Sequence, residues 1–202
     1  MKLSRQLWIL WSVLLLSSCA SIQPRFQEIQ VPPERISQKG FSLVPLNEKG
    51  WLWPTVGRDP YRLTLGKQGD HPDETFAIEA DVGRFPEFKS NEEFLRLVKE
   101  GEAAKPNPSR FKLLKHDVNS YTGKGTDCAR LHTVAEDHGA VKRTERTGHM
   151  VLERLSLICV HPKDKRAGVK VTYSQRYYPS DRDPQFLEKA ASVMNSVEFT
   201  DL

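Results

Sequence analysis

Hydrophobic and polar residues follow the period of β-strands over much of the chain. The stretch 74–81 shows this most clearly, because Phe76, Ile78 and Ala80 stand at alternate positions. Runs of β-forming residues between turn-forming residues mark the other strands. We predict six strands, at residues 61–67, 74–81, 111–118, 127–136, 150–160 and 168–178.

The helical period of hydrophobic residues occurs in two places. Ser90-Asn91-Glu92-Glu93 is a capping box, so we predict a helix over 90–100 that stops at Gly101. Near the C-terminus, Asp183 is the expected cap and Pro184 the first residue of a second helix. One buried face of this helix is predicted to carry Phe186, Ala190, Val193, Met194 and Val197. A last strand is expected over 197–199.

This order of elements predicts an α+β fold. The short connections between the later strands favour an antiparallel meander, with the helices packed on the faces of the sheet. A chain of 202 residues with 38% hydrophobic and 28% charged residues is typical of one soluble domain. We expect this domain to occupy residues 41–202.

The first residues have the layout of a secretory signal. Lys2 and Arg5 precede an apolar run that is interrupted after roughly ten residues, which is too short to span a bilayer. Leu16-Ser17-Ser18-Cys19 resembles the lipobox of bacterial lipoprotein precursors. The resemblance implies removal of signal peptide 1–18 and a lipid on Cys19, which anchors the chain to the membrane. A signal cut elsewhere and an uncleaved anchor are the alternatives. Because Ala20 follows the cysteine, the resemblance implies the outer membrane, with the domain in the periplasm.

Residues 19–40 contain three prolines and several glutamines without sustained periodicity, so we predict a lipidated N-terminus and an extended tether. Such a tether reaches up to roughly 60–70 Å from the membrane. A short strand over 26–31 is the alternative for part of it.

Net charge argues against a nucleic-acid partner. Removal of Lys2 and Arg5 with the leader leaves 28 of the 30 basic residues against 26 acidic residues. The small surplus is scattered among acidic residues and forms no basic patch.

Cys128 and Cys159 are an even pair in an oxidising compartment. If strands 127–136 and 150–160 form a hairpin, one register pairs these cysteines and also Ala135 with Leu152, without overhang. Directly opposite Cα atoms are about 4.5–5.5 Å apart, which suits a disulfide. We predict this disulfide, with two free thiols as the alternative.

No pattern of catalytic or metal-binding residues stands out. Cys128, His132, Cys159 and His161 are residue types that zinc accepts as ligands. On a strand, however, Cys128 and His132 lie about 13 Å apart, too far to hold one ion without other segments, so neither a metal nor a cofactor is expected. The nucleophile-elbow and zinc-protease motifs are missing from the sequence. An enzyme, such as a hydrolase, requires a deep pocket that collects at least two groups from a set of five: His116, Asp117, His132, Glu136 and Glu153.

Aromatic residues supply the candidate surface for a ligand or partner, at Trp51, Trp53 and Tyr61. Packing in the core is the alternative for these side chains, as it is for Tyr173, Tyr177 and Tyr178.

From Phe41 onward, the capped helix, the meander and the closing helix and strand over 186–199 resemble the PsbP-like fold. The resemblance implies an α/β/α sandwich, and members of that fold generally bind or stabilise protein assemblies without a shared active site. We therefore expect a non-enzymatic binding or assembly module with an envelope protein as partner. An envelope enzyme is the alternative.

Overall fold

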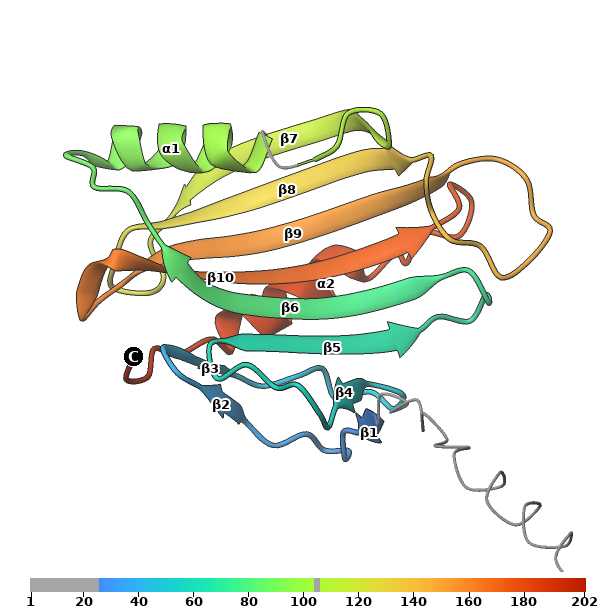
Figure 1. Ribbon diagram of the computed structural model, residues 1–202, viewed down its shortest axis with the longest axis horizontal. Coiled ribbons are helices and arrows are strands. Elements are labelled where there is room, and N and C mark those ends of the chain that lie inside the picture. The colour runs from blue at the N-terminus through green and yellow to red at the C-terminus, as the bar shows by residue number, and fades with distance from the viewer. Residues whose placement is uncertain (1–25, 104–105) are drawn as a thin grey trace, which may run out of the picture.

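The computed structural model describes residues 26–103 and 106–202, and within these ranges the chain is an α+β protein built on one large antiparallel sheet (Figure 1). The predicted α+β class, with an antiparallel sheet, is therefore confirmed. Ten strands and two helices are found in the described ranges: β1 (Phe26–Glu28), β2 (Ile36–Gln38), β3 (Phe41–Leu43), β4 (Leu52–Pro54), β5 (Arg62–Gln68), β6 (Thr75–Arg84), α1 (Asn91–Ala103), β7 (Phe111–Tyr121), β8 (Cys128–Asp137), β9 (Met150–His161), β10 (Asp164–Tyr177) and α2 (Phe186–Asn195).

The main sheet has eight strands in the order β1-β4-β5-β6-β10-β9-β8-β7. The last four strands in sequence form the expected meander, because each pairs with the next in antiparallel orientation. β10 then pairs with β6 over ten residues, from Ala167 with Arg84 to Arg176 with Thr75. This pairing joins the two halves of the sheet, so the connection from β6 through α1 to β7 crosses from the middle of the sheet to its edge (Figure 1).

The β8–β9 hairpin has the predicted register. Cys128 lies opposite Cys159, and Ala135 lies opposite Leu152. A disulfide joins the two cysteines, whose Cα atoms are 4.1 Å apart, slightly closer than expected. The bond fastens two central strands at the end of the hairpin away from its connecting loop.

Helix α1 covers one face of the sheet. The Ser90 hydroxyl accepts a hydrogen bond from the Glu93 backbone N–H, as the capping box predicts. Phe94 and Val98 are buried against Ala129, Leu131, Ile158 and Val160. The predicted stop at Gly101 is wrong, because the helix continues to Ala103. One interior glycine costs only about 1 kcal/mol, which the packing of the apolar face offsets.

Helix α2 lies on the opposite face, behind the sheet in Figure 1. Strand residues alternate between the two faces, so Leu157 and Cys159 pack with α2 while Ile158 and Val160 pack with α1. The helix begins at Phe186, two residues later than predicted. The Asp183 carboxylate instead accepts hydrogen bonds from the Gln185 backbone N–H and the Lys189 ammonium, and thus supports the turn before the helix.

The N-terminal segment corrects the expected tether. Residues 26–40 are folded onto the domain: β1 pairs with β4, β2 pairs with β3, and the Gly40 N–H donates to the Asp201 carbonyl. The domain therefore includes residues before Phe41, and the alternative of a short strand near Phe26 is confirmed by β1. The expected last strand is reduced to a single bridge between Ser42 and Glu198.

The predicted signal peptide 1–18, the lipobox and Cys19 lie outside the described residues. Within the described ranges, neither helix is long and apolar enough to cross a bilayer.

Candidate binding surface

The three aromatic residues expected at a surface have three different environments. Trp51 is fully buried in the core, 6.3 Å from the ring of Tyr173, so its placement at a surface was wrong. Trp53 is half-buried and packs against the same core, with the Arg58 guanidinium 3.8 Å from its ring centroid. Tyr61, 39% exposed, is the member of this set that lines a groove.

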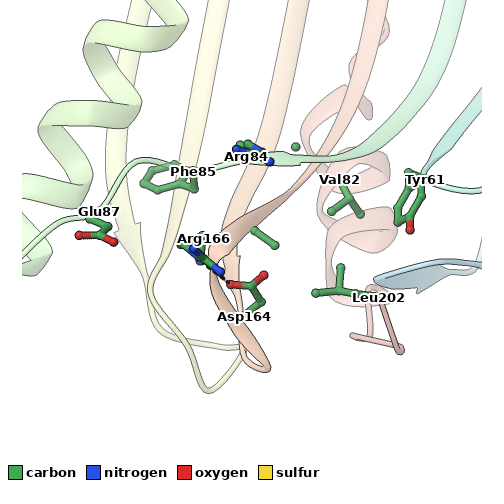
Figure 2. A pocket seen from close by; sticks show the side chains of 10 residues that line it. Tyr61, Val82, Arg84, Phe85, Glu87, Asp164, Arg166 and Leu202 are labelled. Carbon is green, nitrogen blue, oxygen red and sulfur yellow. Dashed lines mark hydrogen bonds and ion pairs between the residues drawn. The ribbon is translucent and has the colours of Figure 1, made fainter.

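This groove, which we call the C-terminal groove, has a volume of about 590 Å³ and lies where β6 ends and the β9–β10 turn begins. Tyr61, Val82 and Leu202 gather at one side of it, and Phe85 and Arg166 lie at the other (Figure 2). The Phe85 backbone N–H donates to the Arg166 carbonyl, which fixes the end of β6 against the start of β10. Segments from the N-terminal, central and C-terminal parts of the chain therefore build one surface.

The C-terminal groove is lined by both apolar and charged side chains. Val82 and Phe85 are half-buried while Tyr61 and Leu202 are exposed, so their apolar surface is accessible to a ligand. Among the charged residues, the closest ion-pair atoms of Arg166 and Asp164 are 3.9 Å apart. Arg84 is exposed and forms no ion pair within residues 26–103 and 106–202. Protein–protein interfaces commonly combine apolar contact area with charged and polar side chains.

A second groove, the helix groove, continues past Gly83, Arg84 and Phe85 to run between α1 and the sheet, with a volume of about 530 Å³. Its floor includes Gly83 and Gly168, which are directly paired on β6 and β10. A Cβ atom on Gly168 would lie 3.2 Å from Phe85, so the glycine lets Phe85 pack close to the strand. Gly83 has no such neighbour, and its missing side chain leaves the floor open.

The five residues considered for an enzyme do not meet in one pocket. Asp117 is exposed beside Lys115, and His116 contacts the Lys99 carbonyl. His132 and Glu153 do form a pair, with His132 Nε2 2.8 Å from Glu153 Oε1. Glu153 is 1% exposed, and the Arg182 guanidinium and the Tyr177 hydroxyl both donate to it.

Electrostatics fix the charge of Glu153. Burial raises the pKa of its carboxyl, but hydrogen bonds from His132, Arg182 and Tyr177 more than offset that effect and lower the pKa to about 2. The same burial, together with the Glu153 charge, raises the pKa of Tyr177. These donors all point at the Glu153 carboxylate. The hydrogen-bond network therefore stabilises the fold, and the carboxylate is not free to act as a base toward a substrate.

Two groups of residues bear on metal binding. The set named from sequence is dispersed, because Cys128 and Cys159 form the disulfide and His161 contacts the Thr200 carbonyl. A different set, which sequence reasoning missed, comes together at the other end of the same hairpin: Glu136, His138 and His149.

Neither a known protein family nor a curated protein matches this chain. Its function is therefore argued from its own residues, among which the C-terminal groove and the adjoining helix groove form the candidate binding surface.

Proposed function

We propose that the chain is a lipid-anchored protein of the bacterial outer membrane whose periplasmic domain binds a protein partner without catalysis. The C-terminal groove carries the binding half of the proposal, because it exposes apolar side chains such as Tyr61 and Leu202 beside charged ones. The lipobox Leu16-Ser17-Ser18-Cys19 carries the anchoring half. The PsbP-like arrangement is part of the same proposal, supported by an antiparallel sheet with a helix on each face.

If Cys19 carries the lipid, the distance between membrane and domain is short. The seven residues 19–25 precede β1 and span at most about 25 Å, compared with the 60–70 Å expected for a longer tether. In Figure 1 the C-terminus lies toward the left end of the long axis, whereas β1 lies near the middle of that axis. The C-terminal groove, which contains Leu202, therefore lies away from the point of attachment and is accessible to a partner.

Anchoring is tested by mass spectrometry and fractionation of cell membranes. The mature N-terminus is expected to be a lipid-modified Cys19, recovered with the outer membrane. A Cys19→Ala variant is expected to leave the membrane fraction. An unmodified Cys19 with the leader attached or cut elsewhere would refute this half of the proposal.

Binding is tested by placing a photo-crosslinking amino acid at position 61 of the full chain in intact cells. One discrete protein adduct is expected there, and none from the same amino acid at Leu187, an exposed residue of α2. Arg84→Glu reverses a charge that lines the groove without breaking an ion pair, and it is expected to reduce the adduct roughly tenfold or more. Equal adducts from positions 61 and 187, or an adduct unaffected by Arg84→Glu, would contradict the assignment of the groove.

A further inference from the structure

Three side chains with metal-binding atoms gather where β8 ends and β9 begins. Glu136 is near the end of β8 and His138 is the first turn residue after it, and the His138 imidazole turns back to contact the Glu136 carboxylate. Asp137 pairs with Met150, and His149 directly precedes Met150, so His149 lies next to His138 across the hairpin. The potential ligand atoms of the three residues all lie within 4.8 Å of one another.

The distances are close to those of a coordinated ion. His138 Nε2 is 3.0 Å from Glu136 Oε2, and His149 Nε2 is 3.9 Å from Glu136 Oε1. Ligands bound at about 2.1 Å in tetrahedral geometry are about 3.4 Å apart. Small side-chain rotations are therefore sufficient to place all three around one ion.

The cluster is also accessible. The side chains of His138 and His149 are 48% and 38% exposed, whereas that of Glu136 is 14% exposed. Each imidazole is at the protein surface, and the two ring centroids are 5.3 Å apart. Two histidines and one carboxylate leave a fourth position to water, as in open zinc sites.

We propose that Glu136, His138 and His149 bind one divalent transition-metal ion, and that this ion is Zn²⁺. Two imidazoles and a carboxylate favour zinc over Mg²⁺, which prefers oxygen ligands. The ion joins the two ends of the 138–149 connection and so closes the hairpin opposite the disulfide. The site lies at the end of the sheet away from the C-terminal groove (Figure 1), so this inference is independent of the proposed binding function.

Lys112 allows a test in which a substitution is expected to strengthen zinc binding. Its ammonium lies 3.2 Å from Glu136 Oε1, where it competes with a metal ion for the same carboxylate. Replacing Lys112 by Met removes that competition and keeps most of the side-chain volume. This change is expected to tighten zinc binding, whereas replacing a ligand weakens it.

The experiment uses the full-length protein without an affinity tag, stripped of metal by a chelator, and measures competition with a chromophoric zinc chelator. One Zn²⁺ per chain is expected, with no comparable binding of Mg²⁺. His138→Gln and His149→Gln are each expected to weaken binding about tenfold or more, and Lys112→Met to strengthen it. The matched control is His116→Gln on β7, which leaves binding unchanged.

Thermal unfolding gives a second readout. Zinc at about a hundredfold excess over its Kd is expected to raise the Tm of the wild type by roughly 5 °C or more, and to leave the His138→Gln, His149→Gln double variant unchanged. Without zinc the two proteins are expected to melt together, because the substituted side chains are at the surface. Equal zinc affinity in the wild type and the double variant, or an equal loss in His116→Gln, would overturn the proposal.

Discussion

Glu153 and Glu136 lie on the neighbouring strands β9 and β8, on the same face of the sheet, and each contacts a histidine, yet their surroundings are opposite in kind. Glu153 is buried, and it accepts hydrogen bonds from Arg182, Tyr177 and His132. Glu136 lies at the edge of the hairpin, where a lysine and two histidines surround it and solvent reaches them.

The different surroundings of the two carboxylates give them different roles: Glu153 supports the fold, and Glu136 is available to bind a ligand. A buried carboxylate stays charged only if donors replace its water, and once they do it has no capacity left for a ligand. The half-buried Glu136 carboxylate keeps part of its hydration, and its neighbours Lys112, His138 and His149 are more exposed than it is. The same pairing of Glu with His thus supports the fold in the middle of the strands and offers a metal site at their end.

The largest expected effect comes from replacing Glu153. Glu153→Gln removes the charge that Arg182 and Tyr177 depend on and turns an amide N–H₂ toward groups that themselves donate. We expect the free energy of unfolding to fall by about 3 kcal/mol at pH 7. Urea unfolding, followed by the fluorescence of tryptophans such as the buried Trp51, measures it. A loss below about 1 kcal/mol would mean that the network does not support the fold.

Lowering the pH is expected to reduce the difference in unfolding free energy between the wild type and Glu153→Gln. In the unfolded chain Glu153 takes up its proton near the ordinary value of 4.5, whereas in the folded protein it does so near 2. The stabilisation is therefore complete above about pH 5 and is lost as the pH falls toward 2, by about 2–3 kcal/mol. Wild type and Glu153→Gln are expected to converge in urea unfolding between pH 5 and pH 2. A constant gap across this range would assign the effect of the substitution to packing alone.

Much of the fold was accessible from the sequence because local and long-range signals agree. The predicted bounds of β8 and β9 allow a hairpin register without overhang that pairs Cys128 with Cys159, so the disulfide could be predicted from these bounds together with the even pair of cysteines. The N-terminal part gave no such signal. Strands β1 to β4 have three residues each, too few to show a period, and their stability depends on long-range contacts such as the hydrogen bond from Gly40 to Asp201.

The sites were less accessible. Tyr61 was identified from its residue type, but Phe85 and Leu202 join it only through the crossing of β6 and the docking of the C-terminus. The same reasoning from residue type also placed Trp51 at the surface, but Trp51 is buried in the core. A signal for the metal cluster did exist: the register that pairs Cys128 with Cys159 also places residue 138 opposite 149. Sequence reasoning examined the cysteine end of the hairpin and not its loop end.

The smallest expected effect completes the comparison. Glu136→Gln removes a carboxylate whose partners Lys112 and His138 are largely exposed, so water readily replaces the lost contacts. In the absence of zinc, Tm is expected to change by less than about 2 °C in calorimetry, although zinc binding is expected to weaken. The loss of charge also removes the ion pair with Lys112, so that Lys112 no longer competes with zinc for the side chain at position 136. A destabilisation equal to that of Glu153→Gln would place both carboxylates in one structural role, and the distinction between a saturated and an available carboxylate would fail.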